Sequence, residues 1–152
     1  MKLLENITTI KQLEIINRLD FFKEFTLAER QVLLESFSHL YLIGQNKYAF
    51  KRFEQDNRLY IILSGELRIF AEKSHIDIGH VGPGEFVGEG AFICHRERST
   101  SAQAVSDTIV LAITAEALTK LPAVIREKIK DKIIEGMSER IHKLNHYIEE
   151  QF

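Results

Sequence analysis

The sequence has little of several residue types, and each shortage excludes something. Its 152 residues include one cysteine and no tryptophan, and the formal charge at pH 7 is −2. A single cysteine, Cys94, cannot form an internal disulfide, which fits a reducing compartment. The charge lacks the basic excess that is typical of nucleic-acid-binding domains. We therefore expect a cytoplasmic protein that does not bind nucleic acid.

Long apolar runs are also missing. No segment reaches the roughly 20 apolar residues that a membrane span needs. The N-terminus "MKLLENITTIKQLEI" lacks the continuous apolar region of a signal peptide. The hydrophobic content of 45% in 152 residues is enough for one domain with a real core and too little for two. We expect a single domain that does not contact the membrane.

The N-terminal part of the chain has a helical pattern. Its apolar residues recur at steps of three: Ile10, Leu13, Ile16 and Leu19. This spacing favours an amphipathic helix over a strand. Thr26 and Glu29 form a capping box, which predicts that a second helix begins there and runs to about Phe37.

The C-terminal part also has a helical pattern. Thr114 suits the cap of a short helix, and Pro122 suits the first turn of a long one. In the long helix the apolar residues share an arc of about 120°: Ile129, Ile133, Met137, Ile141, Leu144 and Ile148. A small β domain cannot cover almost 30 residues of helix, so we expect a homodimer through this helix. The alternative is a helix folded entirely onto its own domain.

The middle of the chain is a series of short apolar runs broken by turn residues. From Leu40 to Ile113 these runs predict several strands without a long helix between them. Ser64-Gly65 is a two-residue hairpin signal, and Pro83-Gly84 marks another turn. The predicted class is α+β, mainly β: an antiparallel β-roll or jelly roll flanked by helices. Its parts are a helical lead-in at 1–38, the roll at 39–114 and C-terminal helices at 115–152.

Glycines gather in one stretch of the roll. Five of the eight glycines lie within twelve residues: Gly79, Gly82, Gly84, Gly88 and Gly90. Glycine-rich backbone can direct its N–H groups into one concavity, and a helical turn at "EGAFI" would add the free amides of Gly90 and Ala91. Arg98 offers a planar fork for phosphate, while Glu89, an acceptor, suits a sugar hydroxyl. Together they describe a ribose phosphate site. Equally open at this point is a set of plain turns, with Glu89 solvated and Arg98 paired with a surface acid.

The stretch "GEFVGEGAFICHRERSTSAQA" resembles the phosphate-binding cassette of cyclic-nucleotide-binding domains of the catabolite activator and protein kinase A regulatory-subunit type. The interval of nine residues from Glu89 to Arg98 is within the habit of that family. Three further segments resemble the family in the same order: "LDFFKEFTLAERQVLLESF", "LYIILSGELRIF" and "GHVGPGEFVGE". The long C-terminal helix matches in position, so the resemblance covers almost the whole chain.

The resemblance implies a ligand-binding set within a cassette at 84–102: Gly88, Glu89, Gly90, Ala91, Arg98, Ser99 and Thr100. Glu89 would accept from the ribose 2′-hydroxyl, and Arg98 would pair with the exocyclic phosphate oxygens. Ser99 and the amides of Gly90 and Ala91 would complete the phosphate cradle. Thr100 suits a strand position from which it could approach the base. The family pattern has an aliphatic residue where this chain has Gly90.

By the same resemblance, Leu144 and Asn145 align with residues that contact the base. The implied function is a non-enzymatic sensor that binds cAMP, or less favourably cGMP. The C-terminal helix would move with the ligand and change the surface offered to an effector protein. The resemblance implies no metal and no further cofactor.

Three other functions compete with this one. A cupin-type metalloenzyme would use His75, His80 and Glu85, but the alternation in "HIDI" turns His75 and Asp77 away from the core. A transcription factor would need a further domain after the long helix, which has six basic and six acidic residues from Leu121 on. A relative that has lost the nucleotide would be an interaction module, which Gly90 keeps open. Cys94 is expected to be a small buried hydrophobe.

Overall fold

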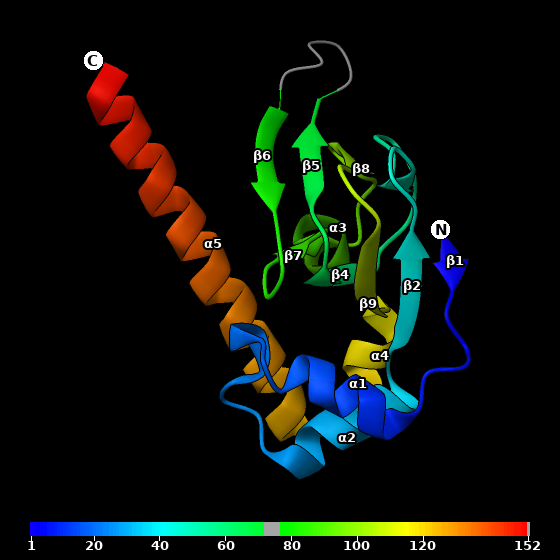
Figure 1. The fold of residues 1–152 in the computed structure, drawn as a ribbon. Helices are drawn as coiled ribbons and strands as arrows, with labels where there is room; N and C mark the ends of the chain where they lie inside the picture. The colour runs from blue at the N-terminus through cyan, green and yellow to red at the C-terminus, as the bar shows by residue number, and fades with distance from the viewer. Residues whose placement is uncertain (72–76, 152) are drawn as a thin grey trace.

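Two antiparallel sheets pack against each other in the computed structural model, which describes residues 1–71 and 77–151 (Figure 1). The five-stranded sheet has the order β1 (Lys2–Leu3), β2 (His39–Ile43), β9 (Thr108–Ile113), β4 (Leu59–Ser64) and β7 (Phe86–Val87). The four-stranded sheet has the order β3 (Tyr48–Phe50), β8 (Ser101–Ala104), β5 (Leu67–Phe70) and β6 (Asp77–Val81). The helices are α1 (Thr9–Ile16), the 3-10 helix η1 (Asp20–Phe22), α2 (Leu27–Ser36), α3 (Glu89–Cys94), α4 (Ala115–Lys120) and α5 (Ala123–Gln151). This confirms the predicted α+β class, with helices at both ends of the chain.

The five-stranded sheet is covered on both faces, which explains its continuous apolar sequence. On β4, Leu59 and Ile61 belong to the core beneath the helices, while Tyr60 and Ile62 belong to the core between the two sheets. Successive side chains of a strand point to opposite faces. A strand buried on both faces therefore needs apolar residues at every position, as "LYIIL" has.

The predicted hairpin at Ser64-Gly65 is wrong. Strands β4 and β5 belong to different sheets, and the link between them, Gly65 and Glu66, carries the chain from one sheet to the other. The backbone of Glu66 is bonded to the start of β9, with its N–H donating to Thr108 Oγ1 at 3.1 Å. The turn at Pro83-Gly84 is confirmed, since the Glu85 N–H donates to the Gly82 carbonyl at 3.0 Å.

The predicted helix starts are confirmed, and some predicted burial is not. Both bonds of the Thr26 capping box are present, and Thr114 caps α4. Helix α1 buries Ile16, but Ile10 is 73% exposed, so the three-residue spacing overstates the apolar face. Ile78 is also exposed, at an irregularity of the β5–β6 pairing. The burial predicted for Cys94 is wrong, because it is the exposed last residue of α3.

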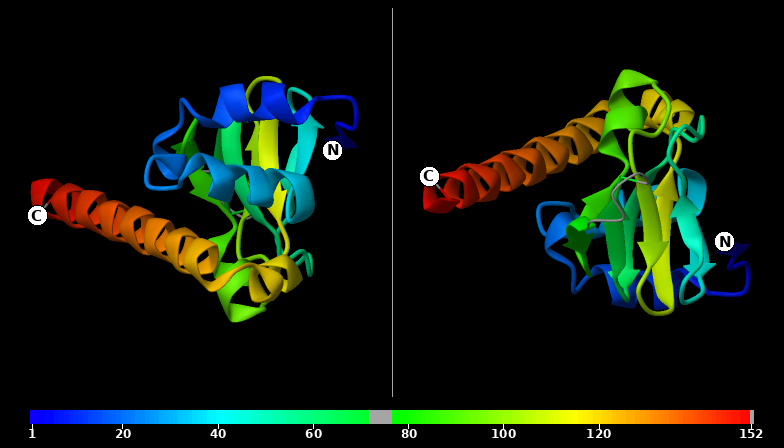
Figure 2. Two further views of the ribbon diagram at one scale, coloured as in Figure 1. Left: turned by 90° about the horizontal axis from the view of Figure 1, so that it is seen from below. Right: turned by 90° about the horizontal axis from the view of Figure 1, so that it is seen from above.

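Helix α5 is packed in its first half and projects in its second. Its buried residues are Ile125, Ile129 and Ile133, whereas every residue from Ile141 to Gln151 is exposed. Figure 2 shows this end of the helix standing clear of the sheets in two views. Within 1–71 and 77–151, α5 and the shorter helices lack the length or the apolar composition for crossing a membrane.

Candidate functional site

The junction of β7 and α3 depends on a glycine. Gly88 precedes α3 with a φ of 91°, in the left-handed region that side chains rarely adopt. A Cβ at this position would lie 2.6 Å from Arg98 Nη1 and 2.9 Å from the carbonyl oxygen of Arg58. The glycine therefore permits both the turn and the close approach of Arg98. The helical turn predicted for "EGAFI" is confirmed as α3.

Arg98 is held behind this junction, with only 2% of its surface exposed. Its Nη1 donates to the Gly88 carbonyl at 2.8 Å and its Nη2 to the Arg58 carbonyl at 2.6 Å. The guanidinium lies over the Phe50 ring, 4.1 Å from its centroid. Arg98 Nε is buried and has no hydrogen-bond partner among the residues that the structure describes. A donor in this state is costly, and an anion would satisfy it.

Asp56 is the carboxylate beside Arg98, and Arg58 and Arg98 share it. It accepts from Arg58 Nε at 2.9 Å and from the Tyr60 hydroxyl at 2.5 Å, and lies 3.5 Å from Arg98 Nη2. Burial opposes its ionisation, but the bonds from Arg58 and Tyr60 outweigh burial and hold the pKa of Asp56 below its ordinary value. Burial lowers the pKa of Arg98, and Asp56 offsets part of that shift. One carboxylate thus serves two guanidinium groups, which leaves a positive charge in excess.

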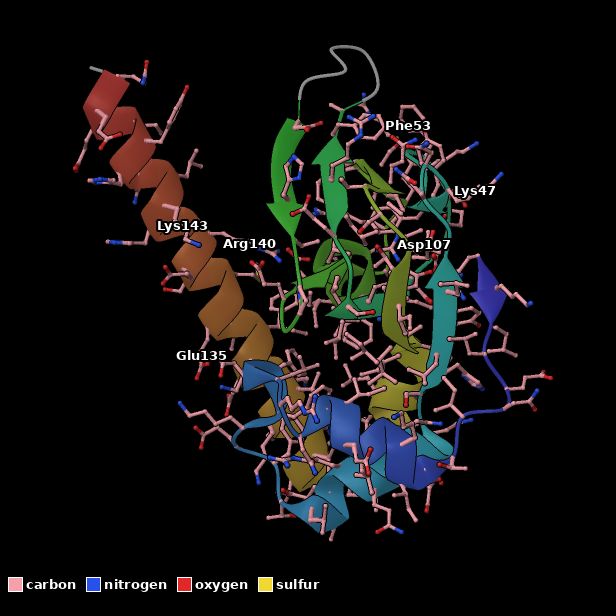
Figure 3. The ribbon with its side chains drawn as sticks, viewed as in Figure 1. Lys47, Phe53, Asp107, Glu135, Arg140 and Lys143 are labelled. Carbon is pink, nitrogen blue, oxygen red and sulfur yellow. The ribbon has the colours of Figure 1, made fainter. Side chains whose placement is uncertain are left out.

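Glu89 opens α3, and its partner comes from α5. Its Oε1 accepts from Arg140 Nη1 at 2.5 Å. Arg140 Nη2 also donates to the Phe86 carbonyl, and the guanidinium lies 4.6 Å from the centroid of the Phe86 ring. Figure 3 shows Arg140 on the side of α5 that faces the sheets. Glu89 is therefore neither solvated nor free.

The other predicted residues take different positions. Ala91 is buried in α3, Ser99 is exposed and Thr100 is half-buried just before β8. Gly90 lies in the first turn of α3, next to Glu89. Leu144 and Asn145 are exposed on the projecting half of α5, and their contact with a base stays a prediction.

Sequence reasoning missed Asp56 and Arg140. Asp56 directly precedes "NRLYIIL", where its acidic side chain beside an apolar strand was the available signal. Arg140 lies among the mixed charges of α5, and nothing in the local sequence distinguishes it from its neighbours. Both meet the cassette only through the tertiary fold.

The residues considered for a metal do not converge. His80 lies between Glu66 at 3.1 Å and Asp77 at 2.8 Å, and these carboxylates raise its pKa above the ordinary value. Glu85 accepts instead from the Gly82 N–H at 3.0 Å. His75 lies outside the described residues. Among residues 1–71 and 77–151, no group of three or more His, Cys, Asp or Glu side chains is placed to hold a metal ion.

Comparison with known proteins gives the same family by sequence and by fold. The family described as "Cyclic nucleotide-binding domain" matches residues 42–123. The chain is 35% identical over 96 residues to the cyclic AMP receptor protein of Thermus thermophilus, covering 59% of this chain and 44% of that relative. A cyclic nucleotide-binding domain from Methylobacillus flagellatus superposes with a TM-score of 0.80 at 23% identity, covering 95% and 84% of the two chains. The catabolite activator protein of Thermus thermophilus gives 0.70 at 27% identity, covering 85% and 61%. The chain thus spans less than half the length of the curated relative.

Substitution of Asp56 tests the shared carboxylate. Asp56→Asn should lower the free energy of unfolding at pH 7 by about 2–4 kcal/mol, because it leaves two guanidinium groups without a charge partner. Asp77→Asn is the control, since solvent screens the exposed Asp77–Arg68 pair and its loss should change the free energy of unfolding far less.

The effect of Asp56 should depend on pH in a defined direction. Its pKa is lower in the folded than in the unfolded chain, so its stabilisation is complete above the unfolded value of about 4 and is lost as the pH falls through the folded value. Urea unfolding at pH 7, 5 and 3 measures this. A wild-type advantage over Asp56→Asn that is as large at pH 3 as at pH 7 contradicts the assignment.

The two glycines at the start of the cassette should respond differently to alanine. Gly88→Ala should destabilise the protein by about 1–3 kcal/mol, because it forces φ > 0 on a side chain and meets Arg98. At Gly90 the new Cβ would meet only the end of the exposed Arg96 side chain, at 2.7 Å. Gly90→Ala should therefore stabilise α3 by about 0.5–1 kcal/mol. Thermal unfolding of both variants measures this, and equal losses would refute it.

Proposed function

Because the chain belongs to the cyclic nucleotide-binding domain family, we propose that its cassette binds a 3′,5′-cyclic nucleotide, cAMP before cGMP, and that the chain acts as a regulatory sensor without catalysis. The preference for cAMP is supported by the name of the Thermus relative, a cyclic AMP receptor protein. The phosphate would be recognised at Arg98 and the ribose at Glu89. Ser99, Thr100 and the amides of Gly90 and Ala91 complete the proposed site.

The excess positive charge at Arg98 is the observation that carries this proposal. Two guanidinium groups share Asp56, and Arg98 Nε lacks a partner among the described residues. A phosphate would supply the second negative charge and accept from Arg98 in a charge-assisted fork. Its oxygens would replace the carbonyls of Gly88 and Arg58 as acceptors. Because Arg98 bonds to the carbonyl of Gly88, replacing that acceptor with a phosphate oxygen would change the contacts of the residue that precedes α3.

Glu89 supplies the acceptor for a ribose hydroxyl. A carboxylate accepts hydrogen bonds and repels phosphate, so its position at the first residue of α3 suits the sugar. Its present partner, Arg140, belongs to α5. A ribose that bonds to Glu89 would therefore change a contact of α5, which gives the sensor a route from ligand to helix.

We propose further that α5 forms a homodimer. Five exposed apolar residues follow the alternating spacing of three and four that a coiled-coil seam requires: Ile134, Met137, Ile141, Leu144 and Ile148, between 43% and 64% exposed. A projecting helix with such a stripe is stabilised by burying it against an equivalent helix. Ligand-dependent movement of α5 would then change the surface available to an effector protein.

A nucleotide-independent interaction module is the second candidate, and a specific observation favours it. Both Nη atoms of Arg98 and the carboxylate of Glu89 already have partners within the chain. These internal contacts hold both side chains in place without a ligand. One similar structure, at 15% identity, is described as the regulatory subunit of a cAMP-independent protein kinase A from Trypanosoma brucei, so the fold alone does not decide whether cAMP is the ligand.

Calorimetric titration with cAMP and 2′-deoxy-cAMP tests the function and the role of Glu89 together. The wild type should bind cAMP roughly tenfold to a hundredfold more tightly than the deoxy analogue, as expected for a hydrogen bond to a charged group. Glu89→Ala should abolish this discrimination, while Glu97→Ala, which changes an exposed glutamate between α3 and β8, should keep it. Arg98→Lys should weaken both ligands at least tenfold, because lysine lacks the planar fork.

Circular dichroism of each variant checks that its fold is intact. Absence of heat from cAMP, cGMP and a cyclic dinucleotide with the wild type would leave the interaction module as the function. Undiminished binding by Arg98→Lys and Glu89→Ala would place the nucleotide elsewhere.

Light scattering after size-exclusion chromatography tests the dimer. The wild type should have twice the mass of the chain at tens of micromolar, and Ile141→Glu should be a monomer, because it places a charge in the apolar stripe. Val124→Glu is the matched control, being 60% exposed on α5 and outside the stripe. A monomeric wild type at high micromolar concentration would reject the dimer.

A further inference from the structure

Gly136 lies where α5 packs against Phe86 of β7, a strand within the cassette. A Cβ at this position would lie 2.5 Å from Phe86 Cζ, so the ring occupies the space that any other residue would fill. A glycine inside a helix costs about 0.5–1 kcal/mol relative to alanine. Gly136 has no φ that demands glycine. Its presence is therefore explained by packing against Phe86.

Phe86 has little freedom to give way. It is 4% exposed, and its ring meets that of Phe21 edge-on with 6.0 Å between the centroids. The ring is thus fixed between η1 and the backbone of α5. Because Phe86 is separated from Gly88 only by Val87, the position of α5 is set against the start of the cassette.

Arg140, one helical turn after Gly136, also holds α5 against Phe86 and the start of α3. It donates to the Phe86 carbonyl and to Glu89, and it lies over the Phe86 ring. Beyond it every residue of α5 up to Gln151 is exposed. We name the contacts of Gly136 and Arg140 with Phe86 and Glu89 the α5 joint.

A groove of about 330 Å³ runs beside the α5 joint. Its walls include Asp20, Gly84 and Glu85 on one side and Lys132 and Glu139 of α5 on the other. Charged side chains line much of the groove, next to the rings of Phe21 and Phe86.

We propose that Gly136 is a positioning residue: by seating Phe86 in the surface of α5, it holds Arg140 on Glu89 and so sets α5 in competition with the ribose for that carboxylate. The competition rests on the function proposed above, whereas the seating of α5 does not. A nucleotide that takes Glu89 releases Arg140, and the helix then turns about the Gly136–Phe86 contact. A larger residue at 136 would displace the helix without any nucleotide.

Distance measurement between two spin labels tests the seating. Cys94 is the sole cysteine and is exposed on α3, so His142→Cys on the exposed part of α5 completes the pair. Without added nucleotide, the parent should give a narrow distance distribution, and Gly136→Ala a shifted or broader one. Ser138→Ala, at an exposed position of the same helix, is the control and should match the parent.

A second substitution distinguishes a steric clash with Phe86 from any other effect of alanine on α5. Phe86→Leu removes the ring tip that the alanine Cβ would meet, so adding it to Gly136→Ala should restore the narrow distribution. A distribution for Gly136→Ala that equals that of Ser138→Ala overturns the proposal. So does a displacement that Phe86→Leu fails to relieve.

Titration with cAMP tests the competition. Gly136→Ala should bind cAMP about threefold to tenfold more tightly than the parent, because less of the protein has Glu89 occupied by Arg140. Weaker binding by Gly136→Ala, with the displacement of α5 confirmed, overturns the competition. Absence of cAMP binding in every variant refutes the proposed function instead, and the distance measurements then still decide the seating.

Discussion

The buried guanidinium of Arg98 is the group on which the cassette depends. It bonds to the carbonyls of Gly88 and Arg58, which belong to segments thirty residues apart in the sequence, and it lies over Phe50 between the sheets. A buried cation needs a paired charge and hydrogen bonds to offset the loss of its hydration. Asp56 supplies the charge and the backbone supplies the acceptors. The geometry of the turn at Gly88 follows, because no other residue leaves room for the guanidinium.

The sheet that carries these groups is stable because it is buried on both faces. Helices cover one face of the five-stranded sheet and the four-stranded sheet covers the other. Burying Arg98 and Asp56 costs desolvation free energy, and the burial of apolar side chains on both faces of this sheet offsets that loss. The contrast is α5, whose second half has no such support and lies exposed.

Local physics predicts much of this chain, and nonlocal contacts account for what sequence reasoning missed. Capping by Thr26 and Thr114, the strands and the turn into α3 all follow from neighbours in sequence. The hairpin at Ser64-Gly65 was wrong because the partners of β4 and β5 come from distant strands. Glu89 and Arg98 are recognisable in one motif, but Arg140 meets Glu89 across 51 residues. The burial of Cys94 was wrong because it was expected from the residue type alone, whereas the end of α3 leaves this position exposed.

The short junction between β7 and α3 explains how a site and a helix can influence each other. Two arginines each take a carbonyl from it: Arg98, from the roll, bonds to Gly88, and Arg140, from α5, bonds to Phe86. A change at either arginine must therefore act on the same few backbone atoms. Coupling between two places requires one element whose position both bias. The junction is such an element, and the glycines at 88 and 136 permit it, since each removes the side chain that would keep an arginine or a ring away.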